Sequence, residues 1–205
     1  GMSTVESIVA ERYSSAADAP EAALCCPVDY DPQYLRQIPD EIIDKDYGCG
    51  DPSRHVREAE TVLDLGSGSG KICYIASQIV GERGRVIGVD MNDDMLALAR
   101  HYQDEMASRL GYGNVTFLKG RIQDLTLDRN RLDLWLREHP VQDEAALGEF
   151  EEYVAELRQN HPLIAADSVD VVLSNCVLNL VDDAQKKQLF DEIYRVLRRG
   201  GRAAI

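Results

Sequence analysis

Short apolar runs alternate with amphipathic segments over the last two thirds of the chain. The apolar runs predict buried strands at residues 61–65, 85–90, 114–118 and 169–175, and a fifth strand that begins at Arg202. Apolar residues at helical spacing predict helices between them, from Lys71 to Gly81, over 93–110 and over 184–198. This alternation predicts an α/β fold, a doubly wound and mostly parallel sheet with helices on both faces.

A glycine-rich turn follows the first predicted strand, where Gly66, Gly68 and Gly70 alternate with serine. Glycine permits a sharp bend and lets a ligand approach the backbone N–H groups, and the helix that follows adds unpaired donors. Asp90 ends the next strand, twenty residues after Gly70, where its carboxylate can accept both hydroxyls of a ribose. The sequence therefore predicts a site for a nucleoside-containing cofactor.

The glycine spacing distinguishes between classes of cofactor. The dinucleotide pattern G-x-G-x-x-G would need a glycine at position 71, and the residue there is Lys71. The pattern present, D-x-G-x-G-x-G from Asp64 to Gly70, resembles the first motif of the class I methyltransferases, which bind S-adenosylmethionine. The resemblance implies the class I methyltransferase type of sheet, and we expect this one to be truncated in its fifth strand.

Length and charge limit the partners of the chain. Its 205 residues suit one α/β domain with short flanks, and 22 Lys and Arg against 36 Asp and Glu give a net charge of −14. A phosphate backbone would be repelled by this charge, so we expect no nucleic-acid partner. No apolar window approaches the length of a membrane span and no signal peptide is present, so we expect a cytoplasmic protein without a membrane partner.

Two regions and one insertion are predicted. Residues 1–58 form a leader and a cysteine-bearing cap, and residues 59–205 form the domain that binds S-adenosylmethionine. An insertion at about 126–166 precedes the fourth strand, where a short link would suffice. Leu147, Phe150, Val154 and Leu157 have helical spacing, so the insertion is expected to be helical and to serve either as a lid or as decoration.

The chain has five cysteines, which are Cys25, Cys26, Cys49, Cys73 and Cys176. Their odd number and a cytosolic location argue against a disulfide framework, and their spacing does not fit a structural zinc site. Free cysteine often behaves as a small buried hydrophobe, so Cys73, in the helix after the glycine turn, is predicted to lie in the core.

Three further segments carry a more specific resemblance. Tyr47-Gly48-Cys49-Gly50, Ser174-Asn175-Cys176-Val177 and the helix end Tyr194–Leu197 before Gly200-Gly201 together resemble the arsenite methyltransferases. The resemblance implies that Cys49 and Cys176 bind trivalent arsenic, and that Cys25 or Cys26 takes part in the thiol cycle as an upstream catalytic cysteine. It also implies a reducing thiol system as partner, and a further family cysteine that would lie past Ile205.

Residue chemistry supports this interpretation. Trivalent arsenic is a soft centre that prefers thiolates to carboxylates and keeps a lone pair. Cys176 follows the end of the fourth strand and Cys49 lies in a glycine-flanked segment, so both thiols are expected to face the cofactor. A lone pair aligned with a methyl group needs no general base, and alignment alone can supply several kcal/mol, up to about 7–11 in ideal cases.

The resemblance to class I methyltransferases also implies the remainder of the cofactor pocket. Met91 would lie against the adenine, Ile122 and Gln123 would give it an apolar wall and a backbone N–H, and Tyr47 and Asn175 would close the methionine end. The predicted cofactor-binding residues are thus Tyr47, Asp64, Gly66, Ser67, Gly68, Gly70, Asp90, Met91, Ile122, Gln123 and Asn175.

Two alternatives stay open at this stage. One is another small-molecule methyltransferase that acts on carbon or oxygen, which would need a base that the sequence does not offer. The other is a non-catalytic thiol module that binds soft ions, for which an intact cofactor motif would have no use.

Overall fold

The computed structural model describes residues 30–46, 50–174 and 181–205, and Cys25, Cys26, Tyr47, Cys49, Asn175 and Cys176 lie outside these ranges. Within them, five parallel strands form one sheet in the order β3-β2-β1-β4-β5. The strands are β1 (Thr61–Leu65), β2 (Arg85–Asp90), β3 (Val115–Lys119), β4 (Val169–Ser174) and β5 (Leu197–Ala204). The predicted doubly wound parallel sheet is confirmed.

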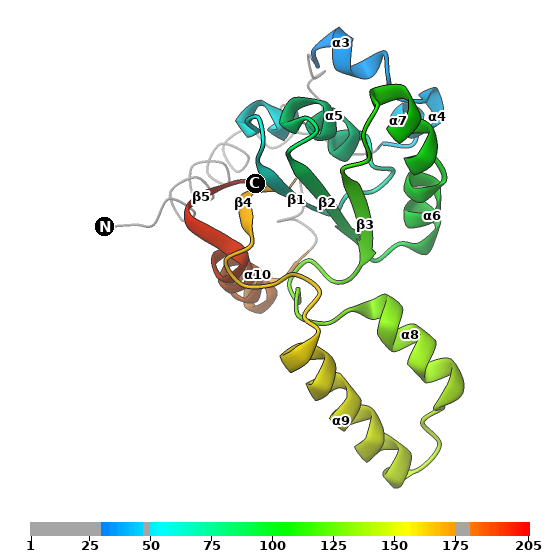
Figure 1. The fold of residues 1–205 in the computed structure, drawn as a ribbon. Coiled ribbons are helices and arrows are strands. Elements are labelled where there is room, and N and C mark those ends of the chain that lie inside the picture. The colour runs from blue at the N-terminus through cyan, green and yellow to red at the C-terminus, as the bar shows by residue number, and fades with distance from the viewer. Residues whose placement is uncertain (1–29, 47–49, 175–180) are drawn as a thin grey trace.

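Helices cover both faces of the sheet (Figure 1). Among residues 30–46 and 50–60, three short elements precede the first strand, the helices α3 (Pro32–Leu35) and α4 (Asp40–Asp44) and the 3-10 helix η1 (Pro52–His55). The longer helices are α5 (Lys71–Val80), α6 (Asp93–His101), α7 (Gln103–Leu110), α8 (Arg129–Glu138), α9 (Glu144–Asn160) and α10 (Asp183–Val196). No helix among the described residues is long and apolar enough to cross a membrane.

Alternating side chains of the central strands supply two cores. In β1, Val62 belongs to one cluster and Leu63 to the other, because successive side chains of a strand point to opposite faces. The first cluster packs against α5, α6 and α7, and it also buries Ile38 and Ile42, so residues 30–46 share the core of the sheet. The second cluster packs against α10.

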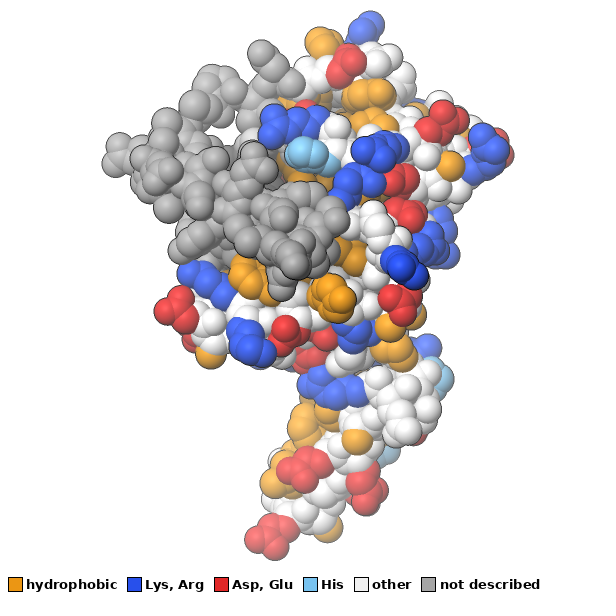
Figure 2. All heavy atoms as spheres, turned by 90° about the vertical axis from the view of Figure 1, so that its left-hand side faces the viewer, with side chains coloured by type: hydrophobic (Ala, Val, Ile, Leu, Met, Phe, Trp, Pro, Cys, Tyr) orange, Lys and Arg blue, Asp and Glu red, His pale blue; other side chains and the backbone are white. Residues whose placement is uncertain are grey.

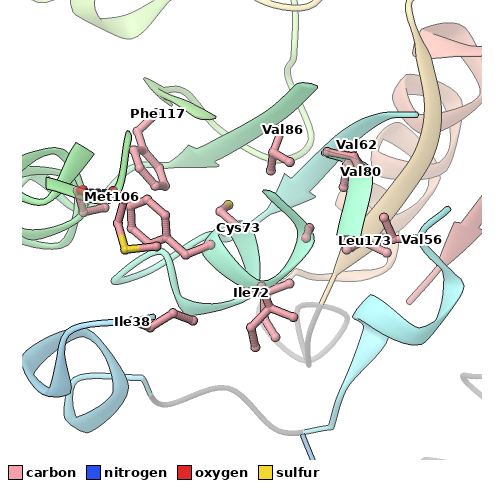
Figure 3. Close-up of a cluster of buried hydrophobic side chains, with 14 of the residues drawn as sticks. Ile38, Val56, Val62, Ile72, Cys73, Val80, Val86, Met106, Phe117 and Leu173 are labelled. Atoms are coloured by element: carbon pink, nitrogen blue, oxygen red, sulfur yellow. Dashed lines mark hydrogen bonds between the residues drawn. The ribbon is translucent and has the colours of Figure 1, made fainter. Parts of the chain in front are cut away.

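Cys73 lies in the first of these clusters. Its side chain has no exposed surface, and Figure 3 shows it between the strands that carry Val86 and Phe117 and the helix residue Ile72. The prediction that Cys73 is a core residue is confirmed.

The predicted single helix over 93–110 is wrong, because the chain breaks at Tyr102 into α6 and α7. Tyr102 has a ψ of 4°, which turns its peptide group off the axis of α6. Its hydroxyl donates a hydrogen bond of 2.6 Å to Glu41 Oε2, far away in the sequence. The apolar stripe continues through both helices, so periodicity alone does not reveal the break.

The predicted start of the fifth strand at Arg202 is also wrong, since β5 begins at Leu197 and α10 ends at Val196. Leu197 pairs with Val169, and the next pair is Arg202 with Val171, so β5 contains an irregular stretch around Gly200, which has a φ of 82°. The glycine pair that was expected to end the helix lies inside this strand.

The insertion forms a helical hairpin of α8 and α9, which confirms its predicted helical character. The hairpin extends away from the sheet (Figure 1) and protrudes as an arm from the main body (Figure 2). It has a small core of its own, in which Leu157 is buried and the rings of Trp135 and Tyr153 stack at 4.6 Å. A role for the hairpin as a lid stays a prediction.

Candidate functional site

The glycine loop lies between β1 and α5 at the carboxyl edge of the sheet. Gly66, Gly68 and Gly70 have φ values of 76°, 54° and 94°, a region that other residues rarely adopt. The N–H groups of Gly66 and Ser67 both donate to the carbonyl of Val89, at 2.8 and 3.0 Å. The loop is thus attached to β2, and these two amides are already used inside the protein.

The individual glycines of the loop have different roles. A Cβ on Gly68 would meet no atom of the described part of the chain within 4 Å, so open space adjoins this residue there. A Cβ on Gly70 would lie 2.9 Å from the ring of Phe117, so Gly70 is required for close packing of the loop on β3. Within the predicted motif, Gly68 therefore adjoins open space, whereas the contacts of Gly70 are structural, and a ligand contact of either glycine stays a prediction.

Ser67 supplies an unused polar atom within the loop, and its Cβ would lie 2.8 Å from a Cβ placed on Gly88 of β2. Its side chain is buried, and its hydroxyl oxygen has no hydrogen-bond partner in the described structure. Buried hydroxyls are normally paired, because leaving one unpaired costs free energy. A polar group of a ligand bound against the loop would satisfy it.

Asp90 ends β2 and contacts the same loop. One carboxylate oxygen accepts the N–H of Gly68 and the other accepts the N–H of Asn92, both at 2.8 Å. A carboxylate has roughly four acceptor positions, so about two are left for the hydroxyls of a ribose. The hydrogen bond between Gly68 and Asp90 brings together the two halves of the predicted cofactor site.

Asp64, also predicted to bind the cofactor, is a buried residue of β1, and its contact with the cofactor stays a prediction. The side chain is only 2% exposed, and Oδ2 is 3.4 Å from Cys73 Sγ. Burial, together with the nearby carboxylates of Asp46 and Asp90, raises the pKa of Asp64 to about 7. Asp64 therefore lies beneath the loop.

The predicted adenine side is formed by the loops after β2 and β3. Asp90 at the end of β2 lies opposite Lys119 at the end of β3 in the register of the two parallel strands. The backbone N–H of Gly120 donates to the carbonyl of Asp90 at 3.1 Å, and this bond holds the two strand ends together. Met91 and Gln123 are partly exposed near these ends, and Ile122 packs against the second core cluster. The contacts expected with adenine stay a prediction.

The cysteines predicted to bind arsenic lie outside the described residues, as do Tyr47 and Asn175. Their described neighbours can be placed. Ser174, which precedes Asn175, pairs with Leu65 at the start of the glycine loop, and its hydroxyl donates to the carbonyl of Leu65 at 3.3 Å. Gly50, which follows Cys49, accepts a hydrogen bond of 2.8 Å from the hydroxyl of Tyr30.

Comparison with known proteins identifies the family. A sequence profile described as a methyltransferase domain matches residues 57–162, and a second profile with the same description matches residues 140–205. The chain belongs to the methyltransferase domain family.

Several relatives of this methyltransferase domain carry the same name. The arsenite methyltransferase of Mus musculus is 36% identical over 83% of this chain and 37% of its own length. That of Aquipseudomonas alcaligenes is 33% identical over 97% of this chain and 48% of its own length. The chain thus spans less than half of the length of these curated relatives.

A solved structure resembles the methyltransferase domain in fold. It is CrArsM, an arsenic (III) S-adenosylmethionine methyltransferase from Chlamydomonas reinhardtii, with a TM-score of 0.62 and 34% identity. The match covers 86% of this chain and 48% of that chain. The sheet described above is therefore that of a class I S-adenosylmethionine-dependent methyltransferase.

Sequence reasoning missed one cluster at the edge of this methyltransferase site. In the sequence, Lys71 was informative only because it stands where a dinucleotide motif would need glycine. In the structure, its ammonium group lies 3.0 Å from Asp46 Oδ2 and 4.0 Å from the centre of the Tyr30 ring. One feature of the sequence could have indicated this cluster. Lys71 is a cation at the first position of a predicted helix, where the helix dipole disfavours positive charge, so a nearby anion is expected.

Proposed function

We propose that this protein transfers a methyl group from S-adenosylmethionine to thiol-bound trivalent arsenic. The cofactor assignment rests on the hydrogen bond between Gly68 and Asp90. This bond places the proposed ribose acceptor, Asp90, beside a glycine that adjoins open space. The arsenic assignment is supported by the similarity to proteins named arsenite methyltransferase and by the cysteine-containing motifs of this chain.

The residues present fit the cofactor. Asp90 would hold the ribose, the backbone at Gly66 and Gly68 would adjoin the amino-acid end, and the unpaired hydroxyl of Ser67 would gain a partner. When bound, S-adenosylmethionine supplies an electrophilic methyl group on a positively charged sulfur. The loop keeps its shape through its own bonds to Val89, so little ordering should be needed on binding.

The arsenic site is proposed to contain Cys49 and Cys176, with Cys25 or Cys26 as an upstream catalytic thiol. Thiolates suit a soft ion, and they leave its lone pair free to attack a methyl carbon. The role of the protein is then to hold two reactants in line. No protein base is required, because no proton leaves the arsenic during this attack.

The partners follow from this chemistry. Trivalent arsenic bound to thiols must be kept reduced, so the protein is proposed to work with a reducing thiol system in the cytoplasm. Nucleic acid is not expected as a partner, since the net charge of −14 would repel it.

The decisive experiment is an incubation of the purified protein with arsenite, glutathione and S-adenosylmethionine, with products identified by mass spectrometry. We expect methylated arsenic and S-adenosylhomocysteine in equal amounts per methyl transferred. Cys49→Ser and Cys176→Ser should each abolish product formation but change the affinity for S-adenosylhomocysteine by less than about threefold. Cofactor binding without any methylated arsenic would contradict the assignment of the substrate and favour another small-molecule methyltransferase.

A further inference from the structure

Lys71 begins helix α5 directly after the glycine loop, at a position where a cation is electrostatically unfavourable. Its side chain is only 11% exposed and forms an ion pair with Asp46, whose side chain is 12% exposed. Taking two such charges out of water costs free energy that a buried ion pair often fails to recover. Stability alone is therefore a weak explanation for this pair.

Tyr30 completes the cluster. Its ring faces the ammonium group of Lys71 at 4.0 Å, an arrangement that attracts a cation to an aromatic face. Its hydroxyl donates to the carbonyl of Gly50 at 2.8 Å. Burial and three neighbouring carboxylates raise the pKa of this hydroxyl, so it keeps the proton that it donates.

These contacts hold both sides of one short segment. Lys71 binds Asp46, the last described residue before residues 47–49, and Tyr30 binds Gly50, the first described residue after them. A further bond ties the same part of the chain to the glycine loop, since the hydroxyl of Ser69 donates to the carbonyl of Ile42 at 2.8 Å.

We propose that Lys71 is a positioning residue, which with Asp46 and Tyr30 fixes the two chain ends that flank Cys49 relative to the cofactor loop. The proposal rests on the proposed function, in which Cys49 binds arsenic. Cys49 is covalently bonded to Gly50, and consecutive Cα atoms are about 3.8 Å apart, so fixing Asp46 and Gly50 restricts the path open to residues 47–49. Since methyl transfer depends on alignment, a small displacement would lower the rate.

The test compares Lys71→Met, which keeps the length of the side chain without the charge, with Lys71→Arg, which keeps the charge. Lys71→Met should lower kcat for arsenic methylation at least tenfold and change the Kd of S-adenosylhomocysteine less than threefold, and Lys71→Arg should recover at least half of kcat. The matched control is Arg202→Met, which removes the ion pair to Glu60, with side chains 15% and 16% exposed, near the start of β1. It should lower the melting temperature without lowering kcat at a temperature where the protein is folded.

A kcat of Lys71→Met within twofold of the wild type would overturn the proposal, as would an equal loss of kcat in Arg202→Met. The rate of alkylation of Cys49 by iodoacetamide, followed by peptide mass spectrometry, gives a readout independent of arsenic. Lys71→Met should change this rate more than fivefold and Arg202→Met should not, and equal rates in all variants would overturn the proposal. If the wild type makes no methylated arsenic, the proposed function fails and the alkylation rates alone decide the role of Lys71.

Discussion

The thiol of Cys73 lies 3.4 Å from a carboxylate oxygen of Asp64, and both side chains are buried beneath the glycine loop. An acid and a thiol in this position are both more favourable in their neutral forms, and burial raises the pKa of each above its ordinary value. The pair therefore makes the stability of the loop sensitive to pH.

The first prediction concerns Asp64→Asn. In the wild type the folded carboxyl has a pKa of about 7, against an ordinary value of 3.8, so between these values the folded state holds a proton that the unfolded state has released. The free energy of unfolding should therefore fall as the pH rises from about 4 to 7. Asp64→Asn should lose this pH dependence, because asparagine does not titrate. The difference in unfolding free energy between the two proteins should therefore change by more than about 1 kcal/mol from pH 5 to pH 8. Urea titrations at both pH values measure it, and a constant difference would contradict the assignment.

The second prediction is that Asp90→Ala weakens the binding of S-adenosylhomocysteine. Removal of hydrogen bonds to a charged group costs about 1.5–3 kcal/mol, or roughly 10- to 150-fold in Kd. The control is Asp94→Ala, which removes an equal charge from an exposed position in the first turn of α6 and should leave Kd within twofold. Isothermal calorimetry is the measurement, and equal affinities in the two variants would exclude Asp90 from the ribose site.

The third prediction separates the glycines of the loop. Gly68→Ala and Gly70→Ala both place a side chain at a positive φ, but only Gly70→Ala also forces a methyl group against Phe117. Overpacking typically costs about 1–3 kcal/mol, so Gly70→Ala should have the lower melting temperature of the two. Gly148→Ala, in the second turn of α9 and without a described atom within 4 Å of the added Cβ, should instead stabilise the protein by about 0.5–1 kcal/mol. Equal melting temperatures for the two loop variants would refute the distinction.

The fourth prediction uses Trp135, the single tryptophan of the chain, which stacks on Tyr153 and His139 in the hairpin. Leu157→Ala empties part of the small hairpin core and should cost about 2–4 kcal/mol. The tryptophan emission should then shift at a lower urea concentration than the far-UV circular dichroism of the whole chain. Leu147→Ala, at a position 45% exposed, should leave the two transitions together. Coincident transitions in Leu157→Ala would mean that the hairpin unfolds only with the sheet.

The parts of the fold that could be predicted from sequence are those with local causes. The strands up to Ser174, the glycine loop and Asp90 follow from contiguous patterns, and the structure has them where the patterns indicate. Tyr102, at the break between α6 and α7, has its hydroxyl bonded to the distant Glu41, and the start of β5 pairs with the distant Val169, so local patterns do not reveal either position.

The same distinction holds for the candidate site. Gly68 and Gly70 are equivalent in the motif, and it is the close approach of Phe117 from β3 and Ala99 from α6 to Gly70 that distinguishes them. The cluster of Lys71 with Asp46 and Tyr30 joins residues far apart in the sequence, so no spacing rule could have found it. The residue types of the site could be read from the sequence, but their long-range contacts could not.

The base of the hairpin has a consequence for how this domain can vary. The N–H groups of Leu163 and Ile164 donate to the carbonyls of Thr126 and Leu125, so the two legs of the insertion leave the main body side by side. Beyond that paired base, α8 still contacts β3 through the ion pair of Asp133 with Lys119 at 2.6 Å, so only the far end of the insertion, around 139–143, is expected to tolerate changes of length. That far end is therefore a natural place to attach a label or a second domain.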